Sequence, residues 1–347
     1  LKSTTYYRLK YSSGSGCGSK FSNTIKISVL SQLEPALISD DQFICFGENA
    51  SIINADIPSS GGINLVSQWQ KSTDSLSWSD VSGETSNSIS PGVLSNSTYF
   101  RLKTVSDFSC GTVFSNTVFL KVYDEFTSGA LVSSQDICFK ETPALLNFSI
   151  TPSGAGENYL YQWKSSTDNL NWQDIAGATI TEYQPVKLAD TTYYKVAVTS
   201  GFGCGTLETN TLSINVFDSL VAGVLDLSQD ICYKETPSLL NFGTVPSGAD
   251  EDYLYQWKSS INNSVWEDIA VESGTEYQPG QLSDTMYYKV AVTSKFGCGT
   301  VETNILSINV FDSLIGGSIG EIDTICYGDS PTKFNTIISP IGGDGNY

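Results

Sequence analysis

The stretch Thr192-Tyr-Tyr-Lys-Val-Ala-Val-Thr-Ser200 decides how this chain folds. Its apolar side chains Tyr194, Val196 and Val198 recur at every second position, with Lys195, Ala197 and Thr199 between them. A period of two places such side chains on one face of a β-strand and leaves that face for a core. The sequence therefore predicts a half-buried strand here.

The same pattern returns along the chain at a fixed period. Trp69, Trp163 and Trp257 are spaced by 94 residues, and each is followed nine residues later by a second tryptophan. Two cysteine series step by 93 or 94 residues, namely Cys17, Cys110, Cys204, Cys298 and Cys45, Cys138, Cys232, Cys326. Self-similarity at one period over the whole chain indicates a tandem array of a single domain type.

The repeats predict three whole domains, at residues 32–123, 124–217 and 218–311. Residues 1–31 align with the C-terminal part of a repeat, and residues 312–347 align with the N-terminal part. We therefore expect the chain to be a segment of a longer repetitive protein.

Short strands separated by turn signals are expected throughout each copy. In the second copy they fall at 144–150, 160–164, 172–175, 181–184 and 207–216, in addition to the strand quoted above. About seven strands in 94 residues, with a core tryptophan on the third, are typical of an immunoglobulin-like sandwich. The predicted fold class is thus all-β, a tandem array of immunoglobulin-like antiparallel β-sandwich domains of about 94 residues.

The composition excludes several classes of function. With 18 Lys and Arg against 37 Asp and Glu the net charge is −19, which argues against binding to a nucleic-acid backbone. The chain has no histidine, which excludes histidine-based catalysis and histidine-ligated zinc. No apolar run reaches the roughly 18 residues that span a bilayer. We expect no enzyme, no nucleic-acid partner and no membrane span in this segment.

Eight cysteines in an acidic, turn-rich β chain indicate disulfides formed in an oxidising compartment, and therefore export. Two pairings fit the spacing. The first is intradomain and joins Cys45 to Cys110, Cys138 to Cys204 and Cys232 to Cys298, with Cys17 and Cys326 pairing outside the segment. The second joins each cysteine of the first series to the next cysteine along the chain, for example Cys110 to Cys138, and leaves none unpaired.

Parity favours the second pairing, whereas geometry favours the first. Residues 113–124 carry the chain from Cys110 to the domain boundary, which is about 40 Å of strand. The Cα atoms of a disulfide must lie within about 7 Å of each other. We therefore expect the intradomain pairing.

Several motifs of the chain resemble one known group of repeats. They include Tyr161-Gln-Trp-Lys-Ser-Ser-Thr-Asp168, Thr192-Tyr-Tyr-Lys-Val-Ala-Val-Thr-Ser200 and Cys204-Gly-Thr-Leu-Glu-Thr-Asn210. They resemble the immunoglobulin-like repeats of very large surface and secreted adhesins of Bacteroidota, among them gliding-motility adhesins exported by type IX secretion. The resemblance implies a bacterial, outer-membrane-associated protein at the cell surface. It also implies motility or secretion machinery and extracellular polysaccharide as partners.

Three kinds of site compete with plain sandwich surface. Carboxylates at Asp174, Glu182, Asp190 and Glu208 could serve a glycosidase, but solvated surface is the expected role and no catalytic residue is assigned. The acidic loop 249–252 offers oxygen ligands to calcium, although its acids change between copies. Trp172 and Trp266 could be platforms for sugars, or could cover the sandwich edge.

In the resembled group, an Asp followed by Ser or Thr and then by an apolar residue or Thr can mark an O-glycosylation site. This resemblance nominates six hydroxyl side chains: Ser75, Thr191, Ser219, Thr285, Ser313 and Thr324.

The expected function is mechanical. The array is predicted to form a structural stalk or filament segment of a very large secreted adhesin, extending a binding end from the cell for adhesion or gliding motility. Short joints such as residues 216–220 favour a semi-stiff rod. Two alternatives remain, a glycan- or surface-binding module array and accessory modules of a secreted polysaccharide hydrolase.

Overall fold

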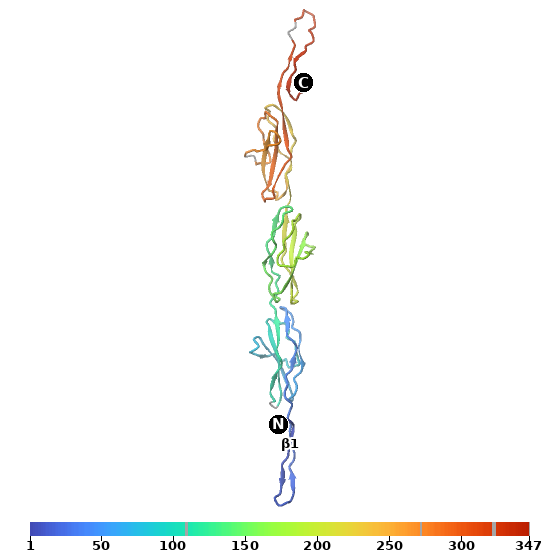
Figure 1. Ribbon diagram of the computed structural model, residues 1–347, viewed down its shortest axis with the longest axis vertical. Coiled ribbons are helices and arrows are strands. Elements are labelled where there is room, and N and C mark those ends of the chain that lie inside the picture. The colour runs from blue at the N-terminus through green and yellow to red at the C-terminus, as the bar shows by residue number, and fades with distance from the viewer. Residues whose placement is uncertain (108–109, 271–272, 321–323, 347) are drawn as a thin grey trace.

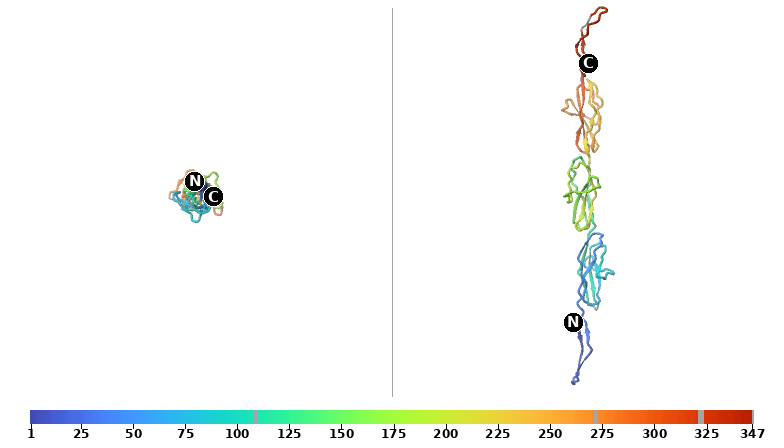
Figure 2. Two further views of the ribbon diagram at one scale, coloured as in Figure 1. Left: turned by 90° about the horizontal axis from the view of Figure 1, so that it is seen from below. Right: turned by 90° about the vertical axis from the view of Figure 1, so that its right-hand side faces the viewer.

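The computed structural model describes residues 1–107, 110–270, 273–320 and 324–346. The chain forms a long rod in which the three expected repeats follow one another along the axis, and the view down that axis is narrow (Figures 1 and 2). Residues 32–123, 124–217 and 218–311 are called modules 1, 2 and 3 below. All elements of the described residues are β-strands, as the sequence predicts.

Module 2 contains two β-sheet layers. The larger sheet has the order β15, β21, β19, β17, β18, with β20 also on β19. Its strands are β15 (Gln135–Ile137), β21 (Leu212–Val216), β19 (Thr192–Ser200), β17 (Tyr159–Ser166), β18 (Gln173–Asp174) and β20 (Thr206–Glu208). The smaller layer pairs β14 (Ala130–Leu131) with β16 (Phe148–Ile150), and residue Tyr183 adds a single bridge to Leu146. The strands β14 and β15 lie outside the stretches that the sequence predicts.

Modules 1 and 3 repeat this arrangement. The strands of module 1 are β5 (Leu37–Ile38), β6 (Gln42–Ile44), β7 (Ile53–Ile57), β8 (Val66–Ser72), β9 (Ser79–Asp80), β10 (Ser88–Ile89), β11 (Thr98–Val105), β12 (Thr112–Phe114) and β13 (Val118–Val122). Those of module 3 are β22 (Asp218–Val221), β23 (Val224–Leu225), β24 (Gln229–Cys232), β25 (Phe242–Thr244), β26 (Ser247–Ala249), β27 (Tyr253–Ser260), β28 (Glu267–Asp268), β29 (Met286–Ser294), β30 (Thr300–Glu302) and β31 (Leu306–Ile315).

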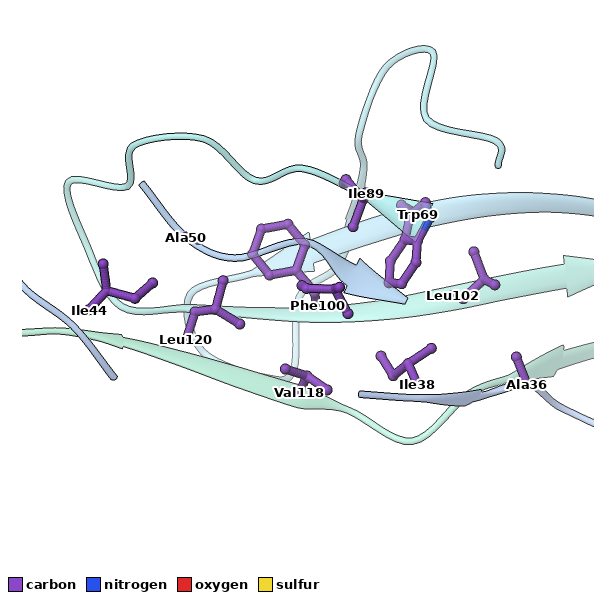
Figure 3. Packing of buried hydrophobic residues seen from close by; sticks show 11 residues of the cluster. Ala36, Ile38, Ile44, Ala50, Trp69, Ile89, Phe100, Leu102, Val118 and Leu120 are labelled. Carbon is purple, nitrogen blue, oxygen red and sulfur yellow. The ribbon is translucent and has the colours of Figure 1, made fainter. Parts of the chain in front are cut away.

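Each module has a core of its own around the repeated tryptophan. Trp69, Trp163 and Trp257 are fully buried, and each indole N–H donates to a backbone carbonyl 17 residues further on at 2.9 to 3.0 Å. In module 1 the indole packs among aliphatic residues from both layers and beside Phe100 (Figure 3). The alternation quoted first is confirmed, because Tyr194, Val196 and Val198 are all buried. Burial of a polar N–H is tolerated here since its hydrogen bond is made.

The ends of the chain are hairpins that continue the rod. At the N-terminus β1 (Thr5–Tyr7) pairs with β4 (Ile25–Ile27), and β2 (Lys10–Ser12) pairs with β3 (Ser19–Phe21). Beyond module 3, β32 (Ser318–Ile319) pairs with β33 (Thr336–Ile338). β34 (Ile341–Gly343) pairs with the extended end of β31.

One parallel pairing determines where the cysteines lie. β15 pairs with β21 in parallel, with Gln135 opposite Ile214, although the other strands of the sheet are antiparallel. Both strands therefore run toward the C-terminal end of module 2, and Cys138, directly after β15, lies at that end. Cys204 lies in the turn between β19 and β20, where β19 has arrived at the N-terminal end.

Candidate functional site: the joints between modules

The disulfides of the structure cross the joints between modules. Cys45 of module 1 is bonded to Cys204 of module 2, and Cys138 of module 2 to Cys298 of module 3. The Cα atoms of these pairs are 5.4 and 5.3 Å apart. The expected intradomain pairing of Cys45 with Cys110, Cys138 with Cys204 and Cys232 with Cys298 is therefore wrong, and so is the alternative that joins consecutive cysteines such as Cys110 and Cys138.

The reason is the position of the two cysteines within one module. In module 2 the first cysteine, Cys138, follows β15 at the C-terminal end of the module. The second, Cys204, lies at the N-terminal end, before β20 and before β21, which runs parallel to β15. The two thiols of a module thus lie at opposite ends, farther apart than the roughly 7 Å that a disulfide bridges. Each thiol instead meets the complementary cysteine of a neighbouring module.

The other four cysteines have exposed free thiols, namely Cys17, Cys110, Cys232 and Cys326. Cys17 and Cys110 occupy the position in their repeats that Cys204 has in module 2. Cys232 and Cys326 occupy the position that Cys138 has. These 347 residues hold no complementary cysteine for any of the four.

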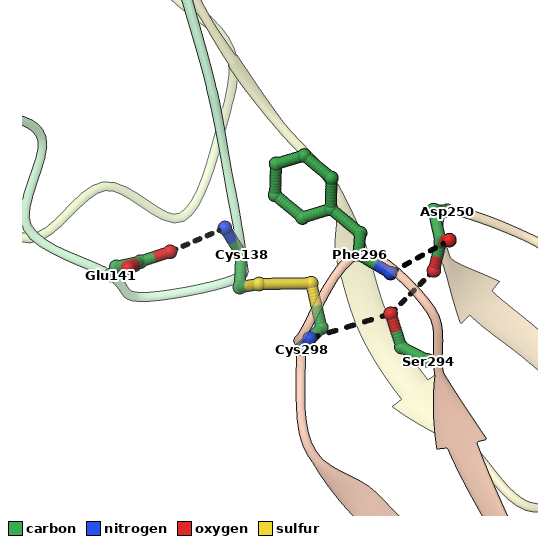
Figure 4. Close-up of a disulfide and its surroundings, with 6 residues drawn as sticks. All are labelled: Cys138, Glu141, Asp250, Ser294, Phe296 and Cys298. Carbon is green, nitrogen blue, oxygen red and sulfur yellow. Dashed lines mark hydrogen bonds between the residues drawn. A yellow bond between two sulfur atoms is a disulfide. The ribbon is translucent and has the colours of Figure 1, made fainter.

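A preformed turn presents Cys138 at the second joint. The backbone N–H of Cys138 donates to the carboxylate of Glu141 at 2.9 Å, and the N–H of Glu141 donates to the carbonyl of Cys138 at 3.0 Å. Lys140 in this turn has a φ of +57° and its N–H donates to the carbonyl of Leu188 at 2.7 Å. These bonds hold Cys138 at the end of the module, and Figure 4 shows the one between its N–H and Glu141.

The opposing half of this joint is built around Asp250. The backbone N–H of Cys298 donates to the Ser294 hydroxyl at 3.3 Å, and that hydroxyl donates to the Asp250 carboxylate. The same carboxylate accepts the N–H of Phe296 at 3.1 Å (Figure 4). The Ser294 hydroxyl, followed by the backbone N–H of Phe296 and the charge of Lys295, lowers the pKa of Asp250. The carboxylate is therefore charged at neutral pH and orders the loop that carries Cys298.

An aromatic pair packs beside each disulfide. The rings of Phe217 and Phe296 lie 4.9 Å apart in an edge-to-face arrangement across the second joint. At the first joint the rings of Tyr123 and Phe202 lie 5.0 Å apart, and Tyr123 is almost fully buried. Such pairs contribute about 0.5–1.5 kcal/mol beyond their area. Each joint is thus held by apolar contact as well as by a covalent bond.

The linker of each joint is fixed along its backbone. At the second joint β22 pairs with β26, with Asp218 opposite Ala249, and only Phe217 separates β22 from β21. At the first joint the N–H of Ala155 donates to the carbonyl of Asp124 at 2.9 Å, and Thr127 bridges Ser153. Backbone pairing therefore fixes the linker at both described joints.

A glycine at each joint allows this close approach. A Cβ at Gly154 would lie 1.9 Å from the carbonyl oxygen of Glu125, and one at Gly248 would lie 2.1 Å from that of Ser219. Both glycines also have a positive φ, of +78° and +80°, which disfavours other residues. The loop of the following module can pack on the linker only because these side chains are missing.

The second tryptophan of each module covers the edge of the larger sheet. The Nζ atom of Lys195 lies 4.2 Å from the ring of Trp172 and 2.6 Å from the carboxylate of Glu208. Lys289 makes the same contacts with Trp266 and Glu302. In module 1, Arg101 lies between the rings of Trp78 and Phe114. A cation thus covers one face of each indole. Only the other face would be open to a sugar.

The remaining acidic candidates are scattered. Asp174 and Glu208 form ion pairs with Lys164 and Lys195, at 3.2 and 2.6 Å. Within the part of the chain that the structure describes, no group of three or more acidic or cysteine side chains could hold a metal ion. In the loop considered for calcium, Asp250 is bound as described above and Asp252 pairs with Lys295 at 2.7 Å.

The six hydroxyl groups considered for glycosylation fall into two groups. Thr191 and Thr285 are half-buried, and their hydroxyl oxygens accept the backbone N–H of Val216 and Val310, both at 3.1 Å. The other four side chains are exposed: Ser75, Ser219, Ser313 and Thr324.

Among the described residues no helix is long and apolar enough to cross a membrane.

Fold and joints together define a tandem array of immunoglobulin-like modules that are linked covalently to their neighbours. The chain belongs to the family described as a domain of unknown function, DUF8696, which it matches three times, over residues 34–124, 127–218 and 221–312. No curated protein matches the sequence.

Solved structures of tandem-domain proteins match this chain at low identity and low TM-score. Mouse cadherin-23 domains EC22–24 match with 9% identity and a TM-score of 0.43, covering 80% of this chain and 99% of that one. Domains 3–5 of Drosophila OTK match with 14% identity and a TM-score of 0.31, covering 80% and 97%. Three domains of the outer capsid protein Hoc of bacteriophage RB49 match with 11% identity and a TM-score of 0.36, covering 80% and 98%.

Proposed function

We propose that this chain is a stiff spacer segment of an exported protein, which holds another part of that protein at a distance. The observation that carries this proposal is the pair of disulfides across the joints, Cys45–Cys204 and Cys138–Cys298. Two modules joined only by a main chain can bend and rotate about that single connection. A second covalent connection beside it removes most of this freedom, and the aromatic pair and the paired linker remove more.

The disulfides also support an extracellular location, because such bonds persist in oxidising compartments. The resemblance to adhesin repeats of Bacteroidota supports a more specific proposal. In this proposal the segment belongs to a large cell-surface adhesin, exported by type IX secretion and used in adhesion or gliding. Its partners would then be neighbouring repeats, the motility or secretion machinery and extracellular polysaccharide, and Ser75, Ser219, Ser313 and Thr324 would be the accessible glycosylation sites.

We propose that the four free cysteines pair with further copies of the repeat. The turn at Cys232 supports this, because its contacts repeat those of the bonded Cys138. The N–H of Cys232 donates to Glu235 at 2.9 Å and the N–H of Lys234 donates to Leu282 at 2.8 Å. Phe311 and Tyr233 line an open hollow beside it. A Phe-Gly-Cys-Gly turn of another module is the matching partner.

Small-angle scattering of the oxidised chain tests the spacer function. Three modules in line at about 40 Å each require a length of more than about 120 Å. The radius of gyration should then be roughly 35 Å or more, against about 20 Å for a compact protein of this size. A compact particle would contradict the proposal. Peptide mass spectrometry of the unreduced parent protein, isolated from its source, tests the flanking repeats, the cysteine pairs and the glycans together.

A further inference from the structure

A second regularity of the cysteines concerns how the rod carries load. The intervals Cys17 to Cys45, Cys110 to Cys138, Cys204 to Cys232 and Cys298 to Cys326 all have the same length. Each interval leaves one module along its last strands and crosses the joint. It then runs along the first strands of the next module to that module's far end. In the interval 204–232 these strands are β20, β21, β22, β23 and β24.

The disulfides join these intervals end to end. Cys45–Cys204 joins interval 17–45 to interval 204–232, and this line is called path 1. Cys138–Cys298 joins interval 110–138 to interval 298–326, and this line is called path 2. Each path therefore crosses one joint through a disulfide and the next along the main chain, without entering the rest of the sandwich.

The two paths lie side by side in every module. In module 1 they are the parallel strands β6 and β13, in module 2 β15 and β21, and in module 3 β24 and β31. Both strands of each pair run along the rod in the same direction. Each module thus contains a stretch in which two paired strands belong to different covalent lines.

The length of an interval shows how little slack these paths contain. The interval from 204 to 232 reaches at most about 100 Å when fully extended. It already spans two modules, because Cys204 is bonded to module 1 and Cys232 lies beside Phe311 and Asp312 at the far end of module 3. Two modules at about 40 Å each take up most of that reach. By contrast, two whole repeats would extend to over about 600 Å if the modules unfolded.

We propose that tension on the rod is borne by the two disulfide-linked paths, so that the modules do not unfold under load. The bulk of each sandwich, including its tryptophan core, then lies outside the line of force. The proposal rests on the spacer function, which supplies the load, and on the proposed pairing of the free cysteines with further repeats, which continues both paths. The load path itself follows from the connectivity.

Single-molecule pulling on the full chain tests the proposal. Handles are attached through azide-bearing phenylalanine analogues at Phe46 and Tyr233, which are exposed and adjoin Cys45 and Cys232. The four free cysteines, Cys17, Cys110, Cys232 and Cys326, are replaced by Ser so that no other pair forms. One covalent route between the handles then runs from residue 46 to 45, through the Cys45–Cys204 bond, and along the chain from 204 to 233. This route, the shortest between the handles, is called the short connection.

The oxidised chain should therefore stop extending near about 100 Å with no unfolding step. After reduction the handles are joined by the whole chain from 46 to 233, and modules 1 and 2 should unfold in two steps of roughly 280 Å each. Full-length steps in the oxidised chain would overturn the proposal.

A matched pair of variants separates the bridges. Cys138→Ser with Cys298→Ser leaves path 1 intact, and should keep the limit of the short connection. Cys45→Ser with Cys204→Ser forces the connection through the other bridge, from 46 to 138 and from 298 back to 233. The limit of this variant should lengthen about fivefold.

Two other outcomes separate the proposal from its alternatives. If the chain with Cys45, Cys138, Cys204 and Cys298 all present extends several times beyond the short connection, the bridge is the intradomain Cys138–Cys204 and the proposal is overturned. A bent particle in scattering, with the limit of the short connection intact, would contradict the spacer function alone and leave the load path standing.

Discussion

The two joints share their covalent and apolar contacts but differ in their polar ones. Both have a disulfide, an aromatic pair at about 5 Å and a glycine against the linker carbonyl. At the first joint the Ser200 hydroxyl donates to the backbone carbonyl of Ala155 at 3.1 Å. At the second, Ser294 donates to the Asp250 carboxylate, and the equivalent of Asp250 in module 2 is Gly156. The difference indicates that a joint needs the three shared contacts, whereas the buried hydroxyl needs only an acceptor.

The largest expected effect is that of the disulfides, and it should be equal at the two joints. The bridges close loops of nearly equal length, with sequence separations of 159 and 160, and this restricts the unfolded chain. We expect Cys45→Ser with Cys204→Ser, and Cys138→Ser with Cys298→Ser, each to cost about 2–4 kcal/mol. Calorimetry of both double variants measures this cost. A loss at one joint only would break the comparison.

The next effect is that of the glycines beside the linkers. Gly154→Ala and Gly248→Ala should each cost about 2 kcal/mol or more, because a Cβ would meet a linker carbonyl oxygen in addition to the strain of a positive φ. Gly177→Ala is the control, since Gly177 has a φ of +76° but nothing within 4 Å of the added Cβ. Thermal melts should show a clearly smaller loss for the control. Equal losses in all three variants would mean that backbone strain alone accounts for the effect.

A smaller effect is expected from the aromatic pairs. Phe202→Ala and Phe296→Ala each remove one ring of a pair, and both rings are about half exposed. We expect a loss of about 1 kcal/mol in each case. Denaturant titration gives the value, and Phe202→Tyr or Phe296→Tyr should retain most of the stability. A neutral Phe296→Ala variant would show that the second joint relies on Asp250 instead.

The smallest effect is a response to acid at the second joint alone. The pKa of Asp250 is lowered in the folded chain, so its stabilising contribution is present above the unfolded value of about 3.8 and is lost as the pH falls through the folded value. The amide signal of Phe296 should therefore shift below about pH 4 in an NMR titration, while that of Phe202 should not. Asp250→Gly, which reproduces the residue of module 2, should abolish the shift. A shift that persists in this variant would assign it to another carboxylate.

The sandwich could be predicted from the sequence because its signals are local. Alternation in the strand 192–200 and the position of Trp163 each depend on a few neighbouring residues, and both predictions are confirmed by burial. The short strands β14 and β15 could not be predicted, because two or three residues are too few to show an alternating pattern. Their pairing with distant strands, and not their own pattern, defines them.

The cysteine pairing was predicted wrongly although the information was present. Residues 113–124 place Cys110 about 40 Å from the C-terminal end of its module. The same length estimate can be made from the N-terminal end of the module to its first cysteine. The stretch from Gln32 to Cys45 corresponds to about 43 Å of strand, which places Cys45 at the far end. Applied to both cysteines, the length estimate separates them by a module length and points each to a neighbour. The aromatic pairs and the role of Asp250 depend on contacts between modules, which no pattern within one repeat reveals.

The overlapping bridges also make the rod tolerant of proteolysis. A cut of the main chain anywhere between Cys45 and Cys298 leaves its two fragments joined by at least one disulfide. Between Cys138 and Cys204 the fragments are joined by both. A protease that nicks an exposed loop of module 2 therefore releases nothing, and the parts that the rod connects stay attached until several separate bonds have been broken.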